Sequence, residues 1–192
     1  GSGGRRTRQV QIMKELSLNI LDVAKNSVTA GATKIEILVE ETPERITITI
    51  TDNGCGMTPE FVKRVTDPFT TTRTTRKVGM GLPLMRMEAQ MSGGDLSIES
   101  NVGEGTTVKS WFDPRNIDMP PLGDLTSSVT TLIQGSPDID FIFTHRTPAG
   151  EYTLDTGEIR QIMGDIPLSE PEVIAWLADY LRENESNIEG KR

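Results

Sequence analysis

The chain has 192 residues, of which 35% are hydrophobic and 25% are charged, as is usual for a soluble globular protein. A net charge of −8 argues against a nucleic-acid partner held on a basic face, and no apolar run approaches the length that spans a membrane. The single cysteine cannot form an internal disulfide, so we expect a protein of the reducing cytoplasm, without membrane contact.

The chain begins with residues 1–8, which we interpret as a tag, Gly-Ser-Gly-Gly, followed by a disordered lead-in. From residue 12 onward, apolar side chains recur at helical spacing, which predicts an amphipathic helix that ends near Ala30. Polar residues occupy one edge of this helix, where they could reach a ligand. They are Asn19, Asp22 and Asn26.

Residues 34–41 and 45–51 alternate apolar and polar side chains, which predicts a β-hairpin with one buried face and one wet, threonine-rich face. Thr58 followed by Pro59 predicts the start of a helix, because threonine caps the first turn and proline is tolerated inside it. This helix should end before Asp67.

Residues 70–78 contain two arginines and a lysine and almost no apolar side chains, which predicts a mobile loop. A helix is expected over residues 81–91, closed by a Ser-Gly-Gly sequence. Residues 95–100 and 106–112 then predict a second hairpin.

A proline-bearing linker, residues 114–123, separates a first domain at residues 9–113 from a C-terminal extension at residues 124–192. We expect the extension to form a small α+β appendage with a short helix capped by Asp124 and a hairpin between residues 141 and 154.

The last predicted helix opens with a capping box at Ser169–Glu172 and runs to about Glu183, with a frayed tail behind it. Trp176 and Tyr180 share one face of this helix; we expect them in the core of the extension, and docking onto another protein is the alternative. His145, the only histidine, is interpreted as structural or as a surface residue rather than as a phosphoacceptor.

The first hairpin runs into the turn Asp52-Asn53-Gly54-Cys55-Gly56-Met57, whose glycines let the backbone approach a flat or charged ligand. Two other segments accompany this turn: Asp22-Val-Ala-Lys-Asn26 upstream and, downstream, Asp67-Pro-Phe-Thr-Thr-Thr with Gly79-Met-Gly-Leu82. In this order the segments resemble the Bergerat-fold ATP-binding domain of gyrase, Hsp90-type chaperones, histidine kinases and mismatch-repair ATPases. The resemblance covers about residues 9–112 and is closest to the histidine-kinase type in its lid and glycine boxes.

The resemblance implies an α+β fold, a two-layer α/β sandwich with a mixed sheet and helices on one face. It also implies that ATP or ADP binds with magnesium. In this interpretation Asp52 reads the adenine amino group and Asn26 is the magnesium ligand. The alternatives are a turn-forming aspartate and an ordinary asparagine on a helix edge.

The residues that the resemblance assigns to the nucleotide come from all of these segments. They are Asn26, Asp52, Gly54, Gly56, Met57, Phe69, Thr70, Thr71, Thr72, Arg73, Lys77, Gly79, Met80, Gly81, Leu82 and Thr106.

Asp22 is the candidate catalytic residue, at a position where the ATPase branches of the resembled family carry a glutamate. Aspartate is one methylene shorter, which predicts slow hydrolysis. We therefore expect a stand-alone regulatory protein, either a histidine-kinase-like or anti-sigma-like kinase that phosphorylates a serine, threonine or histidine of a protein partner, or a nucleotide sensor without chemistry. A weak intrinsic ATPase is the third alternative.

Overall fold

The structure is a computed structural model that describes residues 15–67 and 81–190. In chain order its elements are α2 (Leu16–Thr29), β1 (Lys34–Glu41), β2 (Ile46–Asp52), α3 (Pro59–Val65), α5 (Gly81–Met91), β3 (Asp95–Asn101), β4 (Gly105–Phe112), α6 (Leu125–Gly135), β5 (Asp140–Thr147), β6 (Gly150–Asp155), α7 (Thr156–Met163) and α8 (Pro171–Ile188). Within this described part, no helix combines the length and the apolar character that crossing a membrane requires.

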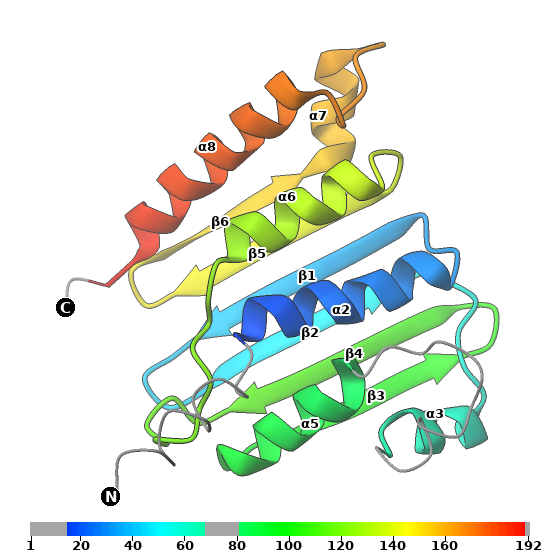
Figure 1. Ribbon diagram of the computed structural model, residues 1–192, viewed down its shortest axis with the longest axis vertical. Helices are drawn as coiled ribbons and strands as arrows, with labels where there is room; N and C mark the ends of the chain where they lie inside the picture. The colour runs from blue at the N-terminus through cyan, green and yellow to red at the C-terminus, as the bar shows by residue number, and fades with distance from the viewer. Residues whose placement is uncertain (1–14, 68–80, 191–192) are drawn as a thin grey trace, which may run out of the picture.

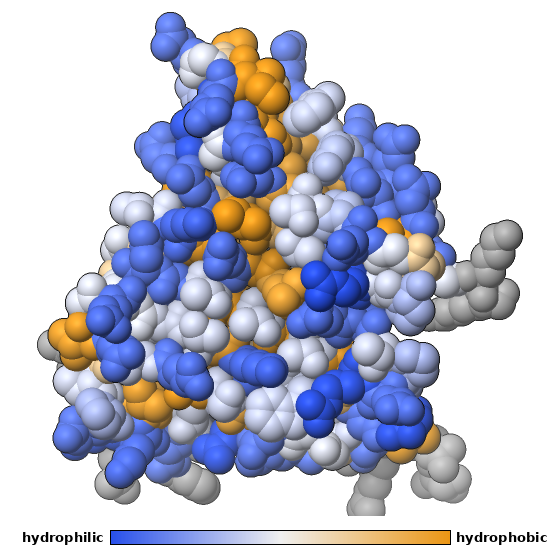
Figure 2. All heavy atoms as spheres, turned by 180° about the vertical axis from the view of Figure 1, so that it is seen from behind, coloured by the Kyte–Doolittle hydropathy of each residue, from blue (hydrophilic) through white to orange (hydrophobic). Residues whose placement is uncertain are grey.

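Six strands form one sheet in the order β3-β4-β2-β1-β5-β6. The sheet is mixed, because β1 pairs antiparallel with β2 and parallel with β5. Helices α2, α5, α6 and α8 lie against one face (Figure 1). Figure 2 shows the opposite face, where hydrophilic and neutral side chains surround an apolar strip. The predicted α+β sandwich, with a mixed sheet and helices on one face, is therefore confirmed.

Helix α2 fills the middle of the helical layer because its apolar side chains recur on one face. Leu16, Ile20 and Val23 are at most 2% exposed. The helix has no side-chain cap at its start; instead, the first backbone N–H groups donate to the carbonyls of Pro121 and Leu122, at 2.9 and 2.8 Å. The proline-bearing segment predicted as a linker thus satisfies donors that α2 would otherwise leave unpaired.

The C-terminal segment is α+β, as expected, but its strands continue the sheet of the first part. β5 pairs in parallel with β1, with Ile35 opposite Phe141 and Ile37 opposite Phe143. All four side chains are at most 2% exposed. This pairing buries an edge of β1 that would otherwise present a row of unpaired backbone groups beside apolar side chains.

Helix α8 differs from the prediction at both ends. It begins at Pro171, and the preceding Glu170 makes no side-chain capping bond, so the predicted capping box at Ser169 is wrong. The helix continues to Ile188, through residues expected to form a frayed tail. Ile188 is buried, and its carbonyl accepts a hydrogen bond from the Thr147 hydroxyl of β5 at 2.6 Å, which holds the end of the helix on the sheet.

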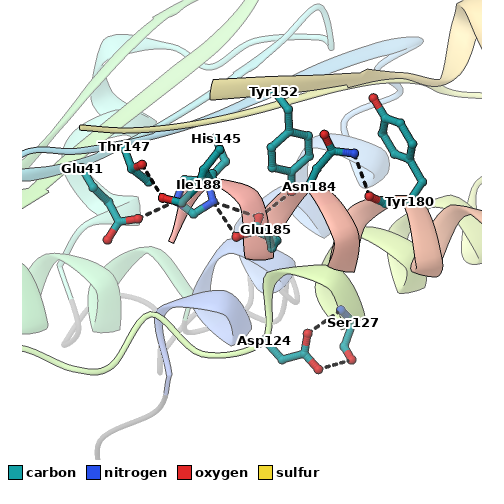
Figure 3. Close-up of polar contacts among 10 residues, drawn as sticks. All are labelled: Glu41, Asp124, Ser127, His145, Thr147, Tyr152, Tyr180, Asn184, Glu185 and Ile188. Atoms are coloured by element: carbon teal, nitrogen blue, oxygen red, sulfur yellow. Dashed lines mark hydrogen bonds and ion pairs between the residues drawn. The ribbon is translucent and has the colours of Figure 1, made fainter. Parts of the chain in front are cut away.

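A buried polar cluster anchors the same end of α8. His145 of β5 lies between two carboxylates, Glu185 of α8 and Glu41 of β1, and Tyr152 of β6 also donates to Glu185 (Figure 3). The His145 nitrogens are 2.8 Å from Glu185 and 2.6 Å from Glu41. The histidine is therefore structural, one of the two interpretations that the sequence left open.

Trp176 does not pack in the core, contrary to the expectation from sequence. The buried face of α8 consists of Val173, Leu177, Leu181 and Ile188, and Trp176 is 50% exposed. Its ring stacks on Tyr180 with the centroids 6.0 Å apart. Tyr180 is partly buried against the core, so only Trp176 departs from the expectation.

Candidate functional site

A cavity of about 580 Å³ lies between α2, α3 and the ends of β2 and β4. Six residues predicted from the sequence line it, and they come from separate elements: Asn26, Asp52, Gly56, Met57, Leu82 and Thr106. Most of the remaining wall is apolar, with Val23, Phe61 and Val108 among the lining residues. Apolar walls with a few polar groups are typical of pockets for a flat organic ligand.

The carboxylate of Asp52 is fixed at the end of β2 by two donors. The Ser27 hydroxyl donates to Oδ2 at 2.6 Å, and the backbone N–H of Gly54 donates to Oδ1 at 2.9 Å. Ionised carboxylate oxygens accept more than one hydrogen bond each and donate none. Asp52 is half-buried and lines the cavity, so it offers an oriented acceptor to a ligand with an N–H or O–H group.

Ser27 is a functional candidate that the sequence analysis missed. It continues the apolar stripe of α2 one turn after Val23, and it is only 4% exposed. A serine in place of an apolar residue on a buried stripe indicates a polar partner. That partner is Asp52, so this signal in the sequence could have identified Ser27.

The two glycines of the turn are required by chain packing. A Cβ on Gly54 would lie 2.9 Å from the carbonyl oxygen of Ala30, and one on Gly56, where φ is +71°, would lie 2.0 Å from the carbonyl oxygen of Asn101. Gly56 lines the cavity, whereas Gly54 lies behind Asp52 and is not among the lining residues. The glycines thus let the turn pack between α2 and the β3–β4 turn.

Thr106 lies beside Asp52, because the two residues are partners in the β2–β4 register. Its hydroxyl is 2.8 Å from the Ser100 hydroxyl, which also accepts a hydrogen bond from the Met57 backbone N–H at 2.7 Å. Ser100 is a second residue that the sequence analysis missed. It ties the glycine turn to β4 and so holds two cavity-lining residues in place.

The polar edge of α2 divides into three different environments. Asn26 lines the cavity, and its Nδ2 atom is buried without a hydrogen-bond partner among the described residues. Asp22 lies against the first turn of α5, where a Cβ on Gly81 would be 3.0 Å from the Asp22 Cβ. Asn19 is fully buried and donates to Glu88 of α5, so it cannot reach a ligand as the sequence suggested.

The residues present fit a magnesium ion that would be held mainly by the phosphate oxygens of a bound molecule. Asn26 lines the cavity, and its side-chain amide oxygen, a hard ligand, is the atom that would bind the ion. Residues 15–67 and 81–190 contain no group of three or more histidine, cysteine, aspartate or glutamate side chains that could hold a metal. Mg²⁺ commonly takes one or two protein ligands and completes its shell with phosphate oxygens and water.

Helix α5 points its first turn toward this edge of α2. Gly81 and Leu82 are buried, and Leu82 lines the cavity. The remaining predicted nucleotide residues lie outside the described residues. They are Phe69, Thr70, Thr71, Thr72, Arg73, Lys77, Gly79 and Met80.

Comparison with known proteins identifies the family of this chain. The family model described as histidine kinase-, DNA gyrase B-, and HSP90-like ATPase matches residues 4–116. The probable C4-dicarboxylate sensor kinase of Bacillus subtilis (strain 168) is 34% identical over 79 residues, which are 41% of this chain and 15% of that protein. The histidine protein kinase DivJ of Caulobacter vibrioides is 31% identical over 100 residues, which are 50% of this chain and 17% of the DivJ chain.

The chain thus spans less than a fifth of the length of these curated relatives. A solved structure, described as the N-terminal domain of a DNA repair protein, superposes with a TM-score of 0.51 at 20% identity, covering 76% of this chain and 53% of that one. At this identity the likeness shows a shared fold. Because the family model covers more than half of the chain, the protein belongs to the histidine kinase-, DNA gyrase B- and HSP90-like ATPase family.

Proposed function

We propose that the protein binds ATP with magnesium in the cavity beside Asp52 and transfers the γ-phosphate to a side chain of a protein partner, as histidine-kinase-like and anti-sigma-like kinases do. The observation that carries the proposal is the Asp52 carboxylate, held by Ser27 and Gly54 at the edge of an apolar cavity. Membership of an ATPase family supports ATP as the ligand.

Adenine fits the chemistry of this cavity better than guanine does. Its exocyclic amine can donate to Asp52, which only accepts hydrogen bonds when ionised. Guanine would present a carbonyl oxygen at the equivalent ring position, and two acceptors would face each other. The apolar side chains of Val23, Phe61 and Val108 would cover the faces of a planar base.

The phosphates would extend from the cavity toward the first turn of α5. Backbone N–H groups at the start of a helix, together with the helix dipole, favour anions. Asp22 packs against Gly81 at this same helix start. A carboxylate there can accept the proton of a partner's hydroxyl or imidazole while that group attacks the γ-phosphate.

Magnesium should raise the affinity for ATP through Asn26. In wild-type protein we expect ATP to bind more tightly with Mg²⁺ than with EDTA. We expect Asn26→Ala to lose most of this difference and to keep its affinity for adenosine, which has no phosphate for the ion to bridge. Titration calorimetry with ATP and adenosine measures both. Equal ATP affinity of the wild type in Mg²⁺ and in EDTA would contradict the role of Asn26.

The transfer reaction is tested with Asp22→Asn. With γ-labelled ATP and the proteins that co-purify from the native host, wild type should label a partner and hydrolyse ATP slowly. Asp22→Asn should keep its ATP affinity and lose the labelling. Because Asp22 packs on Gly81, the amide, which is nearly equal in size, is a suitable variant.

The same experiment separates the alternatives. A wild type that binds ATP, labels nothing and hydrolyses nothing would replace the kinase by a nucleotide sensor. Rapid hydrolysis by the isolated protein would replace it by an ATPase.

A further inference from the structure

A second concave surface lies at the β6 edge of the molecule, between α7 and the start of α8. This α7–α8 groove measures about 590 Å³. Its lining residues are Met163, Asp165, Ile166, Pro167, Glu170, Glu172, Val173 and Trp176. None of them lines the cavity beside Asp52, so the groove is a separate feature.

The groove and the adjoining helix α7 expose large apolar side chains to solvent. Among its lining residues, Ile166 is 51% exposed and Trp176 is 50% exposed; Ile162 of α7, outside the lining, is 82% exposed. Helix α7 buries only Thr156 and Ile159. In Figure 2, apolar atoms gather at the top of the molecule, where α7 lies in Figure 1, with hydrophilic side chains around them. Exposed apolar surface with a polar rim is typical of a protein-binding site.

The charged residues that line the groove all have one sign. Its lining contains three carboxylates, Asp165, Glu170 and Glu172, and no basic residue. None of the three has a hydrogen bond or ion pair from its side chain to another described residue. Residues 156–190 as a whole carry eight carboxylates and two arginines. Of these arginines, Arg160 is already held by Asp140, outside the groove.

From this combination we infer that the α7–α8 groove binds a basic amphipathic peptide segment of a protein partner. Apolar side chains of the segment would rest on Ile166 and Trp176, and its lysines or arginines would pair with the three carboxylates. An arginine suits Trp176 in particular, because this side chain is half exposed in the groove and a guanidinium binds the face of an indole ring. An anionic lipid surface is disfavoured, since the same carboxylates would repel it.

The inference is tested with two synthetic peptides, one of alternating leucine and arginine and one in which serine replaces every leucine. We expect the leucine–arginine peptide to bind the full chain, and Trp176 fluorescence to report this binding. The titrations use Trp111→Phe protein, in which Trp176 is the only tryptophan that contributes fluorescence. The serine–arginine peptide should bind at least tenfold more weakly, because it lacks the apolar side chains.

Three substitutions then test the charges of the groove: Asp165→Asn, Glu170→Gln and Glu172→Gln, combined in one protein. These amides keep the shape of exposed side chains, so the fold should be retained, and circular dichroism checks it. We expect this variant to bind the leucine–arginine peptide at least tenfold more weakly than wild type. Trp176→Ala should weaken binding similarly, and titration calorimetry measures it because this variant lacks the reporting indole.

The matched control removes the same amount of charge elsewhere, with glutamine in place of three exposed glutamates: Glu44, Glu99 and Glu104. It should retain binding within about threefold, since screening limits long-range attraction at physiological salt. An equal loss in the control would overturn the inference, as would the absence of peptide binding to wild type. Concentration-dependent dimerisation that Trp176→Ala abolishes would also overturn it, because the groove would then be a contact between copies.

Discussion

Replacing His145 with alanine is expected to destabilise the folded protein by about 3–5 kcal/mol, the usual cost of removing one partner from a buried ionic group. The His145 side chain is 4% exposed and lies between Glu185 and Glu41. Without the imidazole, the carboxylates of Glu41 and Glu185, whose side chains are only 28% and 19% exposed, face each other without a cation between them. Four elements meet there, α8, β5, β6 and β1, so the loss would loosen the end of α8.

Urea denaturation measures this effect, with Glu151→Gln as the control. Glu151 pairs with Arg146 of the same hairpin, but both side chains are more than half exposed. Exposed pairs contribute at most about 1 kcal/mol, so the control should remain close to wild type. Equal unfolding free energies for His145→Ala and wild type would show that the cluster does not stabilise the fold.

The same cluster predicts a pH dependence. Burial lowers the pKa of His145, but the hydrogen bonds to Glu185 and Glu41 outweigh burial and raise this pKa to about 9, from 6.5. The folded state therefore holds the proton more tightly than the unfolded chain does. The resulting stability is fully present below pH 6.5 and is lost as the pH rises through 9.

Wild-type unfolding free energy should accordingly fall between pH 6.5 and pH 9, and the fall should be smaller in His145→Ala. Tyr152 also faces the cluster, but burial raises its pKa, so Tyr152 does not supply the effect. Parallel slopes for the two proteins would contradict the assignment.

The first part of the fold could be predicted from sequence because its signals are local. The β1–β2 and β3–β4 hairpins show in alternating apolar residues, and the helix over Gly81–Met91 has the expected bounds. The β1–β5 pairing gave no such signal, since it joins residues that are distant in sequence, such as Ile35 and Phe141. Only the tertiary structure shows that an apolar strand needs a neighbour on its open edge.

The site was predictable to the extent that it consists of short-range motifs. Asp52, Gly56 and Met57 belong to one turn, and the structure brings Asn26 and Thr106 to the same cavity. The supporting hydroxyls of Ser27 and Ser100 were missed: Ser27 could have been found from its place on the apolar stripe of α2, whereas only the structure shows the hydrogen bonds of Ser100. The end of α8 was missed for a similar reason, since contacts with β5 hold it in place.

Replacing Asp52 with asparagine should weaken ATP binding by about 1–3 kcal/mol, the range for one lost hydrogen bond to a charged group. This corresponds to a rise in Kd of roughly 5- to 150-fold. Ser27 and Gly54 occupy one side of each carboxylate oxygen. In the amide, one acceptor oxygen becomes a donor, and the adenine amine would lose its charged partner. Asp138→Asn, an exposed aspartate away from the cavity, is the control and should bind ATP as wild type does.

The most direct test of the ATP site is titration calorimetry of ATP and GTP, with magnesium, into wild type, Asp52→Asn and Asp138→Asn. If the cavity beside Asp52 holds adenine, wild type and the control bind ATP more tightly than GTP, and folded Asp52→Asn loses ATP affinity by at least about fivefold. A folded Asp52→Asn protein with the ATP affinity of wild type would contradict the account, because adenine would then lie elsewhere.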